Sequence, residues 1–161
     1  MPHAEMMLPA NAPFLAMVPR RSPEAAVRDR VKAWCNAWSS ETCATDMETL
    51  RPLLGKGALH MMNDFGSDIA LSDSFDTYQA VWMPVLPDTF RNWHLVLASD
   101  VDLRVSQSLA SAAYFTVFGG ETHQGTRMVQ RQAVSTVWEM QDGEWRLVHE
   151  HTSIDSEGRM A

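Results

Sequence analysis

The chain has 161 residues, of which 45% are hydrophobic and 20% charged, and this suits one globular domain with a sizeable core. Its net charge of −7 and its lack of a Lys/Arg cluster exclude the basic face that binding to nucleic acid requires. No run of about 18 apolar residues occurs, so the sequence predicts no membrane span. We therefore expect the partners to be small molecules or another protein chain.

The cysteines and the N-terminal segment indicate the compartment and the limits of the domain. Cys35 and Cys43 have no second Cys or His at metal-clamp spacing, which is typical of reduced thiols in a cytoplasmic protein. The apolar stretch in 1–21 precedes its basic pair, which is the reverse of the order in a signal peptide. We predict an arm over 1–21, one domain over 22–155 and a tail over 156–161.

The first predicted helix begins at Ser22, a typical N-cap residue that is followed by proline at the first helical position. It has about four turns. One apolar stripe runs along it, formed by Val27, Val31, Trp34 and Trp38. The two tryptophans could line a ligand pocket or pack in the core.

Two further helices are predicted in the first half of the chain. Thr45 and Glu48 have the spacing of a capping box, which predicts a helix from Thr45 to Leu53 or Leu54. The segment "ALHMMNDF" predicts a short strand that leads into a polar loop. The third helix begins within 72–74 and is kinked or ended by Pro84. Its apolar face is formed by Phe75, Tyr78, Trp82, Val85 and Leu86.

From Trp93 the periodicity changes from helical to alternating, which predicts β-strands. The four segments with this pattern are "HLVLASDVDLRVS", "SAAYFTVFGG", "TRMVQRQAVSTVWEM" and "EWRLVHEHTS". In the first of them, one face is formed by Leu95, Leu97, Val101, Leu103 and Val105. Helices followed by long antiparallel strands predict an α+β domain whose helices cover one face of a curved sheet.

Asp142 and Gly143 predict a two-residue hairpin turn between the last two strands. A regular ladder from that turn places one set of cross-strand pairs on a single face. These pairs are Met140 with Trp145, Trp138 with Leu147, Thr136 with His149, Val134 with His151, and Gln132 with Ser153. The face is apolar near the turn and polar at its far end, which is typical of a cavity wall.

His149 and His151 alternate across Glu150, so we expect both rings on the tryptophan-rich face, about 6–7 Å apart. A metal site would need a third ligand, and neither an H-E-x-x-H helix nor a cysteine cluster supplies one. We therefore expect no metal and no cofactor. A functional role and a packing role at the rim of the core both remain open for this pair.

The segment "DGEWRLVHEHTS", preceded by a strand ending in "STVW", resembles a hairpin of a known family. It is similar to the C-terminal hairpin of the SnoaL-like, ketosteroid-isomerase-like branch of the nuclear transport factor two superfamily. The helix "DTYQAVW" and the strand "DVDLRVS" fit the family more loosely. The resemblance implies a cone-shaped, curved antiparallel sheet wrapped around three N-terminal helices, with an internal pocket and usually a homodimeric state.

Members of the family include isomerases, cyclases, dehydratases and non-enzymatic modules, so the fold leaves two functions open. As an enzyme, the protein would transfer protons on a small, apolar carbonyl compound. The resemblance makes Asp64 in "MMNDFG" the candidate general base. Tyr78, His149 or His151 could donate a hydrogen bond to the developing oxyanion.

The alternative is a non-catalytic ligand-binding or dimeric association module, whose adaptable surface the eleven methionines favour. The expected dimer contact is the other face of the hairpin, formed by Ser135, Val137, Val148 and Glu150. In both cases, the residues expected to contact the ligand are Trp34, Trp38, Tyr78, Trp82, Gln132 and Thr136.

Overall fold

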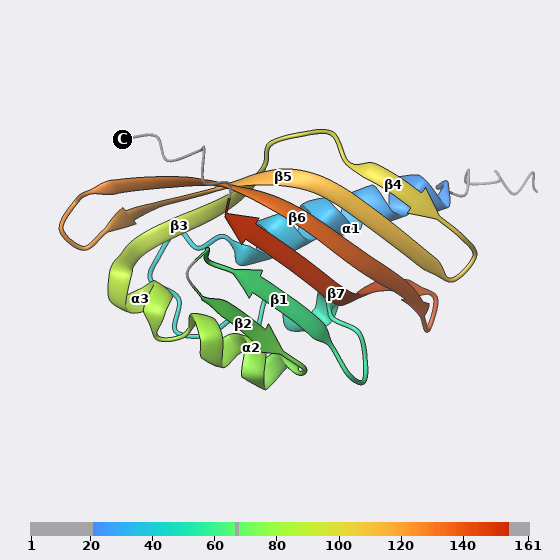
Figure 1. The fold of residues 1–161 in the computed structure, drawn as a ribbon, viewed down its shortest axis with the longest axis horizontal. Helices are drawn as coiled ribbons and strands as arrows, with labels where there is room; N and C mark the ends of the chain where they lie inside the picture. The colour runs from blue at the N-terminus through green and yellow to red at the C-terminus, as the bar shows by residue number, and fades with distance from the viewer. Residues whose placement is uncertain (1–20, 67, 155–161) are drawn as a thin grey trace, which may run out of the picture.

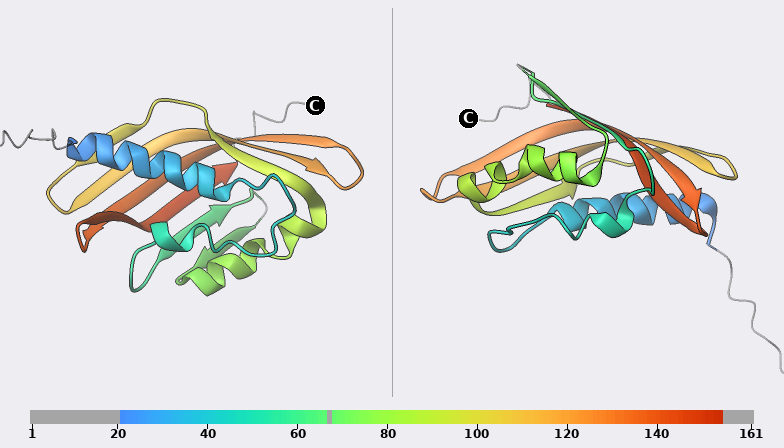
Figure 2. Two further views of the ribbon diagram at one scale, coloured as in Figure 1. Left: turned by 180° about the vertical axis from the view of Figure 1, so that it is seen from behind. Right: turned by 90° about the horizontal axis from the view of Figure 1, so that it is seen from below.

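The computed structural model describes residues 21–66 and 68–154, so the predicted tail 156–161 and nearly all of the predicted arm lie outside the described residues. Helix α1 (Pro23–Trp38) lies along the inner face of the sheet (Figures 1 and 2). It begins as predicted, because the Ser22 side chain accepts a hydrogen bond from the Ala25 amide at 3.2 Å. The predicted stripe of α1 is buried along its whole length.

The prediction of a helix that begins at Thr45 is wrong. Between Thr45 and Leu54 the structure contains only the short 3₁₀ helix η1 (Arg51–Leu53). The Asp46 side chain accepts a hydrogen bond from the Glu48 amide, which forms a local turn that competes with a helix. The Glu48 carboxylate binds Arg51 instead of closing a capping box.

The segment after η1 forms a strand pair and two short helices. Strand β1 (His60–Asp64) lies where it was predicted, and β2 (Ile69–Ser72) pairs antiparallel with it in the region that was predicted to be a loop. Helix α2 (Phe75–Trp82) begins at the capping residue Ser74. Helix α2 ends before Pro84 and α3 (Val85–Thr89) begins after it, which confirms that the helix is interrupted there.

The remaining strands lie where the alternating pattern predicted them, except that one predicted strand is split into two. The first predicted strand is two strands, β3 (Phe90–Leu97) and β4 (Asp102–Val105), which pair with different parts of β5 (Leu109–Thr122). The expected apolar face of these strands packs against the core. Strands β6 (Arg127–Gln141) and β7 (Glu144–Ile154) complete the sheet.

The sheet has the order β2-β1-β7-β6-β5-β3, and it curves over α1 (Figure 2). The α+β class and the curved sheet with helices on one side are therefore confirmed. The sheet is mixed, however, because β1 pairs parallel with β7, His60 opposite His149. Figure 1 shows β1 between β2 and β7, with β2 at the edge of the sheet.

The predicted hairpin is correct near its turn and wrong beyond it. Asp142 and Gly143 both have positive φ, as the predicted turn requires. Met140 pairs with Trp145 and Trp138 with Leu147, as expected. The next pair is Val137 with His149, so Val148 is an extra residue in β7.

A β-bulge of this kind inverts which residues of a strand face the core. Beyond Val148, the observed pairs are Thr136 with Glu150, Val134 with Thr152, and Gln132 with Ile154. The predicted partners His149, His151 and Ser153 are therefore wrong.

The bulge lies where a distant segment joins the sheet edge. The amide of Gly55 donates to the Leu147 carbonyl at 2.7 Å, and Leu54 forms a parallel bridge with Leu147. A Cβ atom at Gly55 would lie 2.7 Å from Cγ1 of Val148, so glycine permits this close approach. The hairpin sequence alone does not reveal this contact.

Candidate functional site

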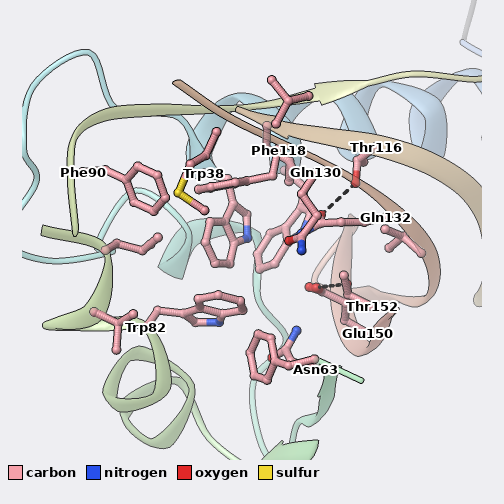
Figure 3. Close-up of a pocket in the computed structure, with 18 of the residues that line it drawn as sticks. Trp38, Asn63, Trp82, Phe90, Thr116, Phe118, Gln130, Gln132, Glu150 and Thr152 are labelled. Atoms are coloured by element: carbon pink, nitrogen blue, oxygen red, sulfur yellow. Dashed lines mark hydrogen bonds between the residues drawn. The ribbon is translucent and has the colours of Figure 1, made fainter. Parts of the chain in front are cut away.

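The concave side of the sheet and the helices enclose a cavity of about 650 Å³, within the range of small-molecule sites (Figure 3). Its wall is largely apolar, and its polar members are few. It is lined by Trp34, Trp38, Asn63, Phe65, Trp82, Val85, Leu86, Phe90, Leu95, Tyr114, Thr116, Phe118, Arg127, Met128, Val129, Gln130, Gln132, Val134, Glu150 and Thr152.

The sheet register places Glu150 in this wall. Residues directly opposite one another on paired strands face the same side of a sheet. Glu150 lies opposite Met61 on β1 and Thr136 on β6, and both of these side chains are buried in the core. The neighbouring row crosses the cavity wall through Asn63, Thr152, Val134 and Tyr114.

Glu150 is buried, with only 4% of the residue exposed. The Tyr78 hydroxyl donates to one of its oxygens at 3.3 Å, and the Thr152 hydroxyl donates to the other at 2.6 Å. Burial raises the pKa of Glu150 to about 7, although hydrogen bonds from Thr152 and Tyr78 act in the opposite direction. Glu150 can therefore accept or donate a proton near neutral pH.

The groups around Glu150 respond to burial and to its charge. Burial raises the pKa of Tyr78 and of Tyr114 well above the usual range, and the nearby Glu150 carboxylate raises both further. The same two causes raise the pKa of the Cys35 thiol to about 12. At neutral pH, Glu150 is therefore the group of this cluster that can exchange its proton.

The predicted ligand-contacting residues fall into two groups. Trp34, Trp38, Trp82 and Gln132 line the cavity. Tyr78 is fully buried behind the wall, where it holds Glu150. Thr136 is also buried, and its hydroxyl accepts a hydrogen bond from the Trp138 indole at 2.9 Å.

The predicted orientation of His149 and His151 is wrong. Because of the bulge, both alternate with the inward-facing Glu150 and Thr152 and lie on the outer face of the sheet. There, His149 lies opposite His60. Burial, followed by the charges of His151 and His60, lowers the pKa of His149. The catalytic role of the pair remains a prediction, but its premise, that the rings face the cavity, is wrong.

Asp64 also lies outside the cavity wall. Its neighbour Asn63 faces the cavity, and Asp64 alternates with it at the end of β1. The Asp64 carboxylate accepts a hydrogen bond from the Gly66 amide at 2.8 Å, within a turn. The predicted role of Asp64 as a base thus has no support from the cavity geometry.

Sequence reasoning missed Glu150, Asn63 and Thr152 as cavity residues. Glu150 was assigned to the outer face because the ladder was assumed to be regular, and a bulge has no reliable sequence signature. Asn63 could have been found, since it adjoins the predicted Asp64 in the same short strand.

Within the described residues, no group of three or more His, Cys, Asp or Glu side chains has the arrangement of a metal site. None of the helices in 21–66 and 68–154 is long and apolar enough to cross a membrane.

The comparisons with known proteins agree with this architecture. A family model described as a SnoaL-like domain matches residues 27–156. A comparison with curated proteins finds no match.

Several solved structures are similar in fold. A domain from Xanthomonas campestris, assigned as a calcium/calmodulin-dependent protein kinase II association domain, is 15% identical with a TM-score of 0.67, covering 88% of this chain and 94% of its own. An NTF2-like protein from Streptomyces avermitilis, assigned as a dehydratase, is 15% identical with a TM-score of 0.62, covering 81% and 95%. The kinase hub homology domain from Chlamydomonas reinhardtii is 20% identical with a TM-score of 0.60, covering 84% and 100%.

Proposed function

The chain belongs to the SnoaL-like domain family, and on that premise we propose that it binds a small, largely apolar carbonyl compound and transfers a proton on it through Glu150. The observation that carries this proposal is a single buried carboxyl group in the wall of an otherwise largely apolar cavity. One of the similar structures is assigned as a dehydratase, which also supports proton-transfer chemistry.

The environment of Glu150 suits a general acid and base. A pKa of about 7 leaves comparable amounts of the ionised and neutral forms at neutral pH, which is the condition for efficient proton transfer. Tyr78 and Thr152 hold the two carboxyl oxygens, so the group is oriented before a ligand enters.

The proposed step is an enolisation. The ionised Glu150 removes a proton from the carbon next to the carbonyl, and the electrons of the C–H bond move to form an enolate. The protonated Glu150 then returns the proton to the same or another carbon. Isomerisation, cyclisation and dehydration can all proceed from this intermediate.

Hydrogen–deuterium exchange tests this step without knowledge of the natural substrate. We would incubate β-tetralone, an apolar bicyclic ketone, with the protein in D₂O and follow loss of the α-proton signals by NMR. The wild type should accelerate exchange over buffer by about 10²–10⁴-fold, the usual contribution of a general base. Glu150→Gln should return exchange to near the buffer rate.

Glu41→Gln is the matched control, because Glu41 is exposed and lies outside the cavity wall. Its exchange rate should equal that of the wild type. Normal exchange in Glu150→Gln would refute the proposal. Loss of exchange in Asp64→Asn, with Glu150→Gln unaffected, would return the role of base to Asp64.

We propose, second, that the outer face of the sheet joins two copies of the chain. Several apolar residues on this side of the sheet are exposed, among them Leu71 at 74%, Val96 at 54% and Phe115 at 37%. Ser135 and Val137 of the predicted contact surface lie on this face, together with His149 and His151 in place of Glu150. The association domain and the hub homology domain among the similar structures favour assembly of this kind.

Light scattering tests this assembly. The wild type should have twice the chain mass of 18.1 kDa at micromolar concentration. Ser135→Arg places a large cation at the centre of the proposed contact and should yield monomers. Thr42→Arg, at an exposed position outside the sheet, should remain dimeric. A monomeric wild type would refute the assembly.

A further inference from the structure

Four polar atoms in the cavity wall are buried and make no hydrogen bond among the described residues. They are the indole nitrogens of Trp38 and Trp82, the Tyr114 hydroxyl and the Asn63 amide oxygen. Buried polar groups in folded proteins are nearly always paired, because an unpaired one loses its hydration without compensation. The concentration of such atoms in one wall therefore points to a ligand that pairs with them.

Other buried tryptophans differ from Trp38 and Trp82 in this respect. The Trp93 indole donates to the Trp38 carbonyl at 2.8 Å, and the Trp138 indole donates to the Thr136 hydroxyl at 2.9 Å. The fold thus satisfies the indole N–H groups of Trp93 and Trp138, and of the three tryptophans that line the cavity, Trp38 and Trp82 are the ones whose indole nitrogens are unpaired.

Trp38 and Trp82 lie close to each other and to the proposed proton-transfer group. Their ring centroids are 5.0 Å apart, and the rings are perpendicular. Both indole N–H groups lie close enough to the Tyr78 hydroxyl to lower its pKa as weak donors, but neither meets it with the geometry of a regular hydrogen bond. The Tyr78 hydroxyl itself donates to Glu150. Figure 3 shows Trp38, Trp82 and Glu150 around the same space.

We propose that Trp38 and Trp82 bind the carbonyl oxygen of the substrate through their indole N–H groups, beside Glu150. This inference rests on the proposed function and defines its substrate class as neutral ketones. The donors would stabilise the enolate oxygen as its charge develops. A carboxylate ligand would be repelled by ionised Glu150, and the cation among the described lining residues, Arg127, is exposed.

A pair of ligands isolates the contribution of the oxygen. β-Tetralone and tetralin share a bicyclic carbon skeleton, and only β-tetralone has a carbonyl. We would measure both dissociation constants by calorimetry for the wild type, Trp38→Phe and Trp82→Phe. Replacing tryptophan by phenylalanine reduces the ring volume, which affects the binding of both ligands alike. The ratio of the two dissociation constants therefore reports the hydrogen bond from the indole N–H to the carbonyl oxygen. We would also record the carbonyl infrared band of bound β-tetralone.

The wild type should bind the ketone about tenfold more tightly than the hydrocarbon, and each variant should lower this ratio by about three- to tenfold. The carbonyl band should lie at lower frequency in the wild type than in the variants. Trp145→Phe is the control, because Trp145 is buried outside the cavity wall, and its ratio should not change.

An unchanged ratio and band in both variants would overturn the inference and indicate that water occupies the donors. If Trp38→Phe does not fold, Trp82→Phe decides, because its residue is only partly buried. Equal affinity of the wild type for both ligands would refute this inference alone. Failure of the wild type to bind either ligand would refute the proposed function as well.

Discussion

The hydroxyl of Tyr78 on α2 and the carboxyl of Glu150 on β7 lie 3.3 Å apart in the interior, although 72 residues separate them in the sequence. This contact joins the helical layer to the sheet through the one carboxyl group in the wall of the described cavity. It connects the stability of the fold with the protonation of the candidate site. The first two predictions depend on it.

Stability should depend on pH through Glu150. Its pKa is about 7 in the folded protein and near 4.5 when the chain is unfolded, so the folded state binds more protons between these values. The resulting stabilisation is complete below about pH 4.5 and is lost as the pH rises through about 7. Glu150→Gln mimics the neutral acid, so it should be more stable than the wild type at pH 8 by about 3 kcal/mol. Urea unfolding at pH 5 and pH 8 measures the difference. An equal free energy of unfolding at pH 8 would contradict it.

Removal of the Tyr78 hydroxyl should cost more at high pH than at low pH. Tyr78→Phe deprives Glu150 of a donor, and the penalty for an ionised carboxylate is about 1.5–3 kcal/mol, against about 0.5–1.5 kcal/mol for a neutral group. Urea unfolding of the wild type and Tyr78→Phe at pH 8 and at pH 5 measures the loss of stability in each case. Tyr114→Phe is the matched control, since Tyr114 is also a buried tyrosine near Glu150 but its hydroxyl does not donate to the Glu150 carboxylate. If Tyr78→Phe and Tyr114→Phe lose the same free energy of unfolding at both pH values, the Tyr78–Glu150 hydrogen bond does not contribute to the pH dependence of stability.

The two cysteines should differ in reactivity. Cys35 is 2% exposed, and burial raises its pKa to about 12, whereas Cys43 is exposed. Because the thiolate is the reactive form, iodoacetamide at pH 8 should modify Cys43 alone in the folded protein. Mass spectrometry of peptides after brief labelling identifies the modified residue. Labelling of Cys35 at the rate of Cys43 would indicate that α1 is not packed as described.

The sequence predicted those parts of the fold that local patterns encode. The cap at Ser22, the buried stripe of α1, the Asp142-Gly143 turn and the alternating strands each depend on neighbours within a few residues. Strand β2 was missed because three of its four side chains are at least partly exposed, so it lacks a clear apolar alternation. The parallel pairing of β1 with β7 joins segments about 90 residues apart, which no local pattern encodes.

The sequence predicted the tryptophans of the candidate site but missed its carboxyl group, Glu150. Trp34, Trp38 and Trp82 belong to amphipathic helices, and their periodicity gave their direction. The direction of Glu150 depends on one extra residue in β7, Val148. That residue reverses every later side chain in the strand, so a correct turn still led to the wrong face for His149 and His151.

The contact between Gly55 and the bulge can be tested by a double-mutant cycle. Gly55→Ala would place a Cβ atom 2.7 Å from Cγ1 of Val148, and overpacking of this kind costs about 1–3 kcal/mol. Val148→Ala removes that carbon, so the cost of Gly55→Ala should fall by about 1 kcal/mol in the Val148→Ala background. Gly119→Ala is the control, because a Cβ atom there would have its closest neighbour at 3.5 Å, and we expect little change. Urea unfolding of the four combinations gives the coupling energy. Additive effects of Gly55→Ala and Val148→Ala would mean that the segment at Gly55 does not press on the bulge, and the bulge would then need another cause.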